Sequence, residues 1–367
     1  MIDLASNGYS AEAVQRALHA ETGARRIWYQ YERLNQYKVP LGWLYAEGGT
    51  IDLDTNAQIM RTAQFVFQED PMVNWQAELI RPWFFLAMPD GGMAKWPLGV
   101  FYMPTVTKTG SAHIYREVEA YDTTTILWDD QVTSRYQIPK GSKYTAALSA
   151  LFTSVGVFDA IIEPSDSVTA TALEWDAGTA KGEIVQQLLT ADNYEPLTAD
   201  AWGHWICRKY KDPRSRRAEY NYTAGQLSVL LAEQTVDDDI FRLPNVFVGV
   251  VSRPDRPAMN FTYEITDPKS PLAAINRGGR HVTETKLYED AASLIALEAD
   301  VRRRASQAAS YFSRLKFSTA PMPHHAAGDV LWIESGDVRG KYQETRWTLD
   351  LRTGGEMKHE VQKEGTL

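Results

Sequence analysis

The feature that most constrains the fold is a run from Arg25 to about Pro139 in which apolar and polar side chains alternate with a period of two. This alternation is typical of β-strands that bury one face. Strands are predicted in six segments, 26–34, 42–53, 58–68, 77–88, 96–107 and 112–128. Turn residues separate them, among them Gly48-Gly49, Pro89-Asp90-Gly91-Gly92 and Thr109-Gly110.

Six sequential strands with short turns leave long edges exposed unless the sheet closes on itself. The pattern therefore favours a closed or nearly closed antiparallel barrel over 25–139. Strand signals return in 209–367, with convincing segments at 245–252, 259–266, 281–288, 329–334, 342–351 and 355–362. We expect a mixed, mainly β chain that contains two antiparallel β-barrel domains, the second over 209–367.

Helical patterns occupy three places. Residues 1–24 form an N-terminal arm with a helix over 10–22, capped by Ser10. Residues 140–208 form a small α/β module with helices near 143–155 and 179–190. A long helix is predicted over 289–312, inside the second barrel domain. Its expected buried stripe is Ala291, Leu294, Ile295, Val301, Ala305, Ala308 and Phe312.

Composition excludes several classes of protein. The chain has 367 residues and a net charge of −9, which is the wrong sign for a general nucleic-acid binder. Its single cysteine, Cys207, excludes an intrachain disulfide and a cysteine-based zinc cluster. No apolar stretch approaches the roughly 20 residues that a membrane-spanning helix needs.

No motif of an active site is present. The sequence contains no G-x-S-x-G, Walker A or H-E-x-x-H pattern, so we expect no enzyme activity, cofactor or metal. His324-His325, near Pro321 and Pro323, is interpreted as an exposed linker, and replacing either histidine with Ala is expected to leave metal content unchanged. Asp237, Asp238 and Asp239 lack the spacing of a calcium loop and are interpreted as a solvated turn.

Two surface features leave alternatives open. Arg302, Arg303 and Arg304 lie opposite the apolar stripe of the long helix, where they could meet an acidic surface on a neighbouring copy. Eleven Trp and eighteen Tyr suit β-rich cores, but also interfaces and sugar-binding surfaces. A carbohydrate-binding or glycan-active β-protein therefore remains an alternative.

The order of elements resembles the tail hub, or baseplate hub, proteins of tailed bacteriophages, which include siphophage minor tail proteins. RRIWYQYERLN and LGWLYAEGGTIDLDTNAQIMRTAQFVFQED resemble the first barrel of such a hub. The module at 140–208 is similar to the insertion that follows it. The segment from Asp267 to Phe312 resembles the strand and long helix of the second half, and AAGDVLWIES with TLDLRTGGEMKHEVQ its closing strands.

This resemblance implies a structural virion protein without enzyme activity. Three copies would form a ring whose six barrels match a sixfold tail tube and distal tail protein to a threefold tip. The implied partners are the tail tube, the distal tail protein, the tape-measure protein and receptor-binding tip proteins. Viral DNA would pass through the lumen without sequence-specific binding, and Asp237, Asp238 and Asp239 are candidates for an acidic lining. A different tail-tip component, such as a distal tail or adhesin-carrier protein, is the remaining alternative. The implied location is the virion tail tip, assembled in the host cytoplasm.

Overall fold

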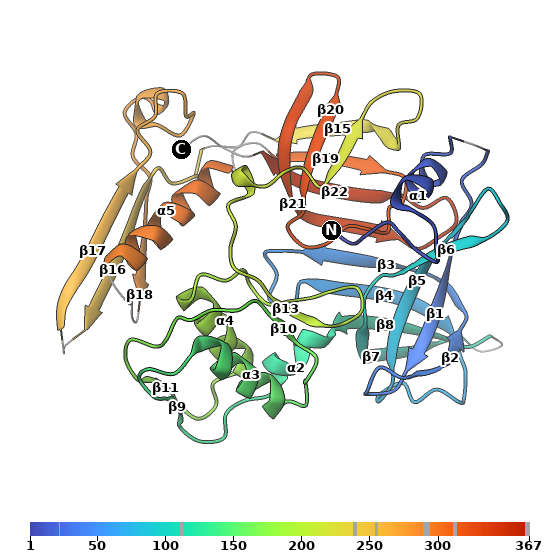
Figure 1. The fold of residues 1–367 in the computed structure, drawn as a ribbon, viewed down its shortest axis with the longest axis horizontal. Coiled ribbons are helices and arrows are strands. Elements are labelled where there is room, and N and C mark those ends of the chain that lie inside the picture. Colours follow the sequence, from blue (N-terminus) through green and yellow to red (C-terminus); the bar gives the residue numbers. More distant parts are fainter. Residues whose placement is uncertain are drawn as a thin grey trace.

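A large sheet dominates the computed structural model, which describes residues 1–21, 23–110, 113–237, 241–253, 256–288, 294–310 and 314–363 (Figure 1). Fourteen described strands pair in this sheet, nearly all of them antiparallel. The main path runs β15-β19-β22-β21-β3-β4-β8-β7-β5-β1-β2, with β14, β20 and β6 paired beside it. The strands of the N-terminal half are β1 (Ile27–Leu34), β2 (Pro40–Leu44), β3 (Ala46–Asp54), β4 (Arg61–Gln68), β5 (Leu79–Ala87), β6 (Met93–Pro97), β7 (Phe101–Thr109) and β8 (Tyr115–Asp122). Those of the C-terminal half are β14 (Tyr220–Thr223), β15 (Leu230–Asp237), β19 (Arg314–Thr319), β20 (Val330–Ser335), β21 (Val338–Asp350) and β22 (Met357–Lys363).

The mainly β character expected from the alternation is confirmed. In β4, Ala63, Phe65 and Phe67 point into the core, while Gln64 and Gln68 are exposed. Two predicted strands are each divided in two, because 42–53 forms β2 and β3 and 96–107 forms β6 and β7.

The predicted turn at Gly48-Gly49 is wrong. Both glycines lie inside β3, at an irregularity in its pairing with β4. A Cβ atom on Gly49 would lie 2.3 Å from the carbonyl oxygen of Gln64 and 2.8 Å from the Phe65 ring. Glycine is therefore required for the close approach of two strands, which is a common reason for glycine within a sheet.

The two halves of the sheet meet where β3 pairs with β21. Leu53 lies opposite Trp347 and Ile51 opposite Leu349, and side chains from both halves share one apolar core. The strand path is open at β15 and at β2, so the pairing among the described residues closes no barrel. The two expected barrels therefore remain a prediction.

The N-terminal helix α1 (Ala11–Leu18) is confirmed, together with its cap. The Ser10 side chain accepts a hydrogen bond from the Ala13 N–H, and Val14 and Leu18 are buried in the core of the large sheet. This amphipathic face holds the arm against the domain.

The middle module has a core of its own. Its helices are α2 (Ile126–Asp129), α3 (Tyr144–Ser154) and α4 (Lys181–Ala191), preceded by the 3-10 turn η1 (Thr123–Thr125). Its short strands are β9 (Tyr136–Ile138), β10 (Ile161–Ile162), β11 (Leu173–Trp175), β12 (Thr198–Ala199) and β13 (Trp205–Cys207). Phe152 packs edge-on against Trp205 at a ring distance of 5.0 Å. The helix predicted at 143–155 and that at 179–190 correspond to α3 and α4.

The long helix α5 (Leu294–Ser310) belongs to a separate layer, seen to the left of the sheet in Figure 1. It covers a three-stranded sheet of β16 (Val246–Arg253), β17 (Arg256–Glu264) and β18 (Thr283–Tyr288). Two further 3-10 turns are η2 (Pro213–Ser215) and η3 (Ala274–Arg277). None of the described helices is long and apolar enough to cross a membrane.

Part of the predicted helical stripe is wrong. Val301, Ala305 and Ala308 are buried, but Leu294 is 49% exposed and Ile295 is 78% exposed. The buried face continues instead through Leu297, which packs with Val301 against the small sheet. Ala291 and Phe312 lie outside the described residues.

Candidate functional sites

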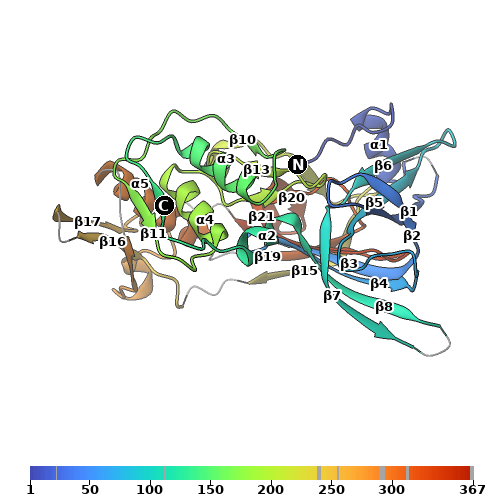
Figure 2. The same ribbon diagram turned by 90° about the horizontal axis from the view of Figure 1, so that it is seen from below.

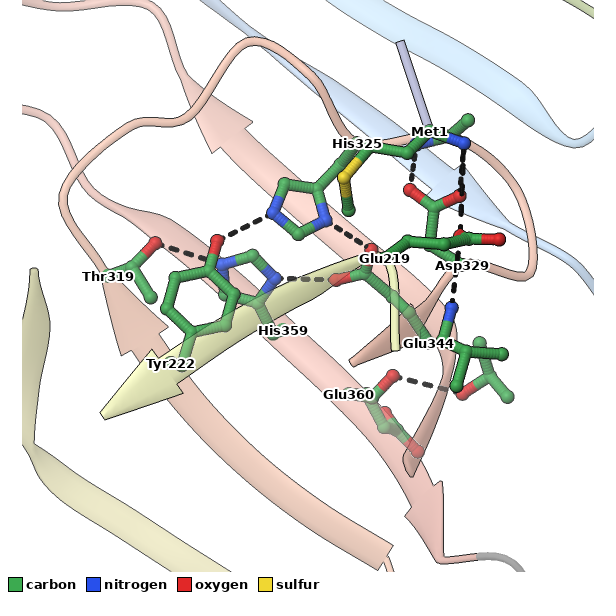
Figure 3. Close-up of polar contacts among 12 residues, drawn as sticks. Met1, Glu219, Tyr222, Thr319, His325, Asp329, Glu344, His359 and Glu360 are labelled. Carbon is green, nitrogen blue, oxygen red and sulfur yellow. Dashed lines mark hydrogen bonds and ion pairs between the residues drawn. The ribbon is translucent and has the colours of Figure 1, made fainter. Parts of the chain in front are cut away.

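A cluster of polar side chains lies inside the C-terminal half of the large sheet. The side chains of His325, Glu344 and His359 are fully buried. His325 lies in the loop between β19 and β20, Glu344 on β21 and His359 on β22 (Figure 3). Nδ1 of His325 is 2.6 Å from Oε2 of Glu344, and Nδ1 of His359 is 2.5 Å from Oε1. One carboxylate thus faces two imidazoles.

The outer nitrogens of both imidazoles also have partners. Nε2 of His325 is 2.6 Å from the Tyr222 hydroxyl on β14, and Nε2 of His359 is 2.9 Å from the Thr319 hydroxyl at the end of β19. The five side chains form one connected chain of contacts (Figure 3). Such a network joins four strands and a loop, and it holds each ring in a fixed orientation.

Strand geometry explains why these residues point inward. His359 alternates with Met357 and Val361 on the buried face of β22. On β21 the pairing with β22 is irregular between Glu344 and Arg346. A bulge shifts the alternation by one residue, so Glu344 on one side of it and Trp347 on the other both face the core.

The buried environment sets the charges of the cluster. Burial by itself raises the pKa of Glu344, but the charges and hydrogen bonds of His325 and His359 outweigh it and hold that pKa at about 2. Burial lowers the pKa of His359, against the opposing effect of Glu344. The carboxylate is therefore ionised in the interior of the protein at neutral pH.

The interpretation of His324-His325 as an exposed linker is wrong. His324 and His325 are 0% and 2% exposed, because the loop that carries them packs against β14, where the His325 ring stacks on Tyr222 and the His324 ring lies tilted against Tyr220. Burial lowers the pKa of His324 well below its ordinary value. Sequence analysis also missed Glu344 and His359, although the position of His359 between Met357 and Val361 marks it as inward-facing.

A second buried carboxylate lies beside this cluster. The α-amino group of Met1 is 2.7 Å from Oδ1 of Asp329, and Oδ2 accepts a hydrogen bond from the Ala326 N–H (Figure 3). Burial raises the pKa of Asp329 to about 7, although the amino group opposes the shift. This contact fixes the N-terminal arm to the loop that contains His325.

The three consecutive arginines of α5 are largely engaged within the chain. Arg303 contacts Asp300 and lies 3.1 Å from the Asn193 side chain, and Arg304 contacts Glu284 and Asp300. Arg302 is the most exposed of the three and pairs with Glu298. These contacts do not test the expected inter-subunit basic face, which remains a prediction.

Of the acidic residues predicted to line a lumen, Asp237 is the last residue of β15. Asp237 pairs with Arg314 of β19 in the strand register. Asp238 and Asp239 lie outside the described residues. The lining role therefore remains a prediction as well.

An exposed apolar edge ends the large sheet. Tyr37, Val39, Leu41, Trp43 and Tyr45, here called the β2 edge, are each between 48% and 76% exposed. Strand β2 pairs with β1 on one side and with no described strand on the other. Natural proteins usually protect bare strand edges, and an exposed apolar patch marks an interaction surface.

A cleft of about 480 Å³ lies between the sheet and the middle module. Arg61 and Glu195 line it, and Trp202 is the one tryptophan among its described lining residues. Trp202 packs edge-on against Trp83 at 5.5 Å and under Arg81. The cleft thus offers a single, partly engaged indole, which is a weak platform for a sugar ring.

Of the comparisons with known proteins, the one with solved structures finds similar folds. No family model and no curated protein matches the sequence. A tail protein from Neisseria meningitidis MC58 matches in structure with a TM-score of 0.68, at 10% identity over 92% of this chain and 97% of that one. The 43 kDa tail protein of prophage MuSo2 from Shewanella oneidensis matches with a TM-score of 0.65, at 10% identity over 90% and 98% of the two chains.

A third match has a lower TM-score. A chain of the Francisella PdpA–VgrG complex in its lidded form has a TM-score of 0.54, at 8% identity over 94% of this chain and 53% of that chain. The likeness extends over nearly the whole chain in all three cases. The resemblance drawn from the sequence is thus confirmed at the level of the fold, which this chain shares with these two tail proteins.

Proposed function

We propose that this chain is a structural protein of a phage tail tip, in which three copies form a hub ring. The ring joins the sixfold tail tube and distal tail protein to a threefold tip and forms part of the DNA exit channel. The observation that carries the proposal is the likeness in fold to two tail proteins, nearly from end to end of each. The function lies in surfaces and assembly, without enzyme chemistry.

The open sheet supports assembly into a ring. A closed ring of identical subunits needs two different surfaces that fit one another head to tail. The large sheet has two unlike ends, the aromatic β2 edge and β15, where Leu231 and Val236 are exposed. A stable interface of this kind commonly buries more than about 2,000 Å². At each end of the sheet the last strand pairs with no further described strand, and these two strands supply starting points for such an interface.

The internal division of the sheet supports the match between threefold and sixfold symmetry. The N-terminal half is antiparallel, the C-terminal half is antiparallel except for the parallel pair β14 and β20, and the two halves are joined side by side through β3 and β21. In the assembled ring each half acts as one barrel-like unit, so that three chains present six units to the tube.

Charge supports the passage of DNA. The net charge of −9 disfavours adhesion of phosphate groups, since like charges repel. Asp237, Asp238 and Asp239 line the lumen in this proposal, and Arg302 with Arg303 and Arg304 provides a basic face toward the next copy. The partners are the distal tail protein, the tail tube, the tape-measure protein and receptor-binding tip proteins, at the virion tail tip.

A pair of matched variants tests the ring. Trp43→Asp places a charge on the β2 edge, and Phe158→Asp makes the same change at a 79% exposed position in the middle module. Both side chains are exposed, so both variants are expected to fold with unchanged circular dichroism. Light scattering after size exclusion should find a trimer for the wild type and Phe158→Asp, and a monomer for Trp43→Asp.

The result that contradicts the proposal is a wild-type monomer at every concentration that also binds glycans on an array. That outcome would favour the carbohydrate-binding alternative. A ring that survives Trp43→Asp would move the interface away from the β2 edge.

A further inference from the structure

The cleft between the large sheet and the middle module contains a buried arginine. Arg61, the first residue of β4, lines this cleft of about 480 Å³ and is 3% exposed. Its Nη1 donates a hydrogen bond to the Leu98 carbonyl oxygen at 3.2 Å, whereas its Nε has no hydrogen-bond partner among the described residues. Within the same described part of the chain, no carboxylate lies at ion-pair distance from the guanidinium.

A guanidinium in this position is unfavourable for the free protein. Burial lowers the pKa of Arg61, and the more distant charges of Asp122 and Asp200 oppose this shift only in part. The Cζ atom of Arg61 lies 5.8 Å from the centre of the Trp347 ring, and this cation–π contact offsets a further part of the cost. Because an arginine side chain keeps its charge in proteins, a negative group has to be brought to it before the charge is balanced.

Two glutamines on the sheet side of the cleft have unused hydrogen-bonding groups. Gln343 of β21 and Gln362 of β22 lie opposite one another in the strand register, and both line the cleft. Gln362 is 6% exposed. Neither side-chain amide has a hydrogen-bond partner among the residues that the structure describes. Each amide offers one acceptor oxygen and one NH2 donor, which are the complements of the N–H and C=O of a peptide group.

The acidic residues of the cleft have interactions of their own, so they leave the charge of Arg61 unpaired. Asp212 forms an ion pair with Arg214 at 2.6 Å, and Asp200 accepts hydrogen bonds within its own turn. Nearby basic side chains favour the ionised form of Glu195, against the effect of burial. A ligand with a single carboxylate balances the one unpaired cation, whereas a phosphate dianion also meets repulsion from these acidic groups.

We propose that this cleft binds a peptide segment that carries an acidic side chain. The carboxylate pairs with the guanidinium of Arg61 through a charge-assisted hydrogen bond, and peptide groups of the segment pair with Gln343 and Gln362. The inference rests on the proposed function in one respect, since the neighbouring proteins of a tail are the source of such a segment. The position of the cleft between two parts of the chain is a common one for ligand sites.

Saturation-transfer NMR titrations on the full-length chain test the ligand class. The probes are acetyl-Ala-Glu-Ala-amide and its uncharged match acetyl-Ala-Gln-Ala-amide, together with sodium acetate and sodium phosphate as free anions. The Glu peptide should bind at least about tenfold more tightly than the Gln peptide, the scale of one hydrogen bond to a charged group. It should also bind more tightly than acetate or phosphate. Equal binding of the two peptides, or binding of a free anion as tight as that of the Glu peptide, would overturn the proposal.

Two variants locate the site. Arg61→Met removes the charge and keeps most of the length of the side chain, so it should weaken binding of the Glu peptide at least about tenfold. The melting temperature of the free variant should equal or exceed that of the wild type, because an unpaired buried charge is removed. Arg25→Met is the matched control, since Arg25 also has two buried nitrogens without partners but does not line the cleft. It should leave peptide binding unchanged.

Three outcomes separate this site from the fold and from the ring. Unchanged peptide binding by Arg61→Met would contradict the assignment of the carboxylate to Arg61. A much lower melting temperature of this variant would show that Arg61 serves the fold, and it would overturn the proposal as well. Light scattering reports the ring independently, so a trimer that binds neither peptide would refute the site and leave the proposed function intact.

Discussion

The two halves of the large sheet have different interiors. In the N-terminal half, Tyr31, Phe65, Phe67 and Phe101 pack ring against ring at 5.4 to 5.8 Å, without a buried carboxylate among them. In the C-terminal half, Tyr222 and Phe317 pack at similar distances against imidazole rings, and Glu344 lies in their midst.

The difference shows that the alternation of side chains along a strand determines which residues face inward. It does not determine whether those residues pack as apolar groups or form a polar network. An apolar interior gains stability from every contact it makes. A polar interior is stable only when all of its groups are paired, because each unpaired buried group costs about 1–3 kcal/mol. The cluster around Glu344 therefore depends on a few specific contacts, whereas the rings around Phe65 depend on close packing.

The largest loss of stability is expected for a substitution among the packed aromatic rings of the N-terminal half. Phe65→Ala removes a ring that contacts Tyr31, Phe67 and Phe101 and is 1% exposed. We expect a loss of about 3–5 kcal/mol in the free energy of unfolding, as for other buried phenylalanines. Denaturant unfolding measures it, and Phe158→Ala at an exposed site should change it by less than about 0.5 kcal/mol. A loss below about 1 kcal/mol would contradict the assignment of Phe65 to a dry core.

A smaller loss of stability is expected for a substitution in the buried polar cluster of the C-terminal half. Glu344→Gln keeps the size of the side chain. Its amide oxygen can still accept a hydrogen bond from one imidazole, but its NH2 group faces the N–H of the other imidazole, and two donors cannot pair. We expect a loss of about 1–3 kcal/mol, the range for one buried group left unpaired. Glu360→Gln is the matched control on β22, because Glu360 is partly exposed and its contacts with Arg314 and Lys316 are 3.7 and 4.0 Å long. Equal effects of the two substitutions would remove the contrast between the halves.

The smallest effect is expected in the reactivity of Cys207, which lies in the apolar core of the middle module. Burial raises the pKa of the Cys207 thiol to about 12, from an ordinary value of 9. At pH 8 the thiolate fraction is therefore lower by roughly a thousandfold than for a free thiol. A thiol reagent should label the folded protein only very slowly and the unfolded protein at once. Rapid labelling of the folded chain would show that this interior opens to solvent.

Much of the fold could be predicted from local patterns. Alternation located most strands, and Ser10 marked the start of α1, because these signals act within a few residues. The strands β14, β15 and β19 were missed, since each depends on a partner far away in the sequence. Gly49 was mistaken for a turn residue for the same reason, as its role is set by Phe65 of the neighbouring strand.

The buried cluster was beyond sequence reasoning for a related cause. A pair of adjacent histidines between prolines suits an exposed loop, and only the contact of that loop with β14 buries it. The bulge that turns Glu344 inward is likewise a property of two paired strands. Position 359 was the one member that alternation could have identified.

The central claim is that three chains close into a ring, and the mass and shape of the purified assembly test it most directly. Sedimentation should give three times the chain mass of 41.4 kDa, and negative-stain images should show a ring with a central opening. A particle of single-chain mass at high concentration, even with the distal tail protein added, would contradict the claim.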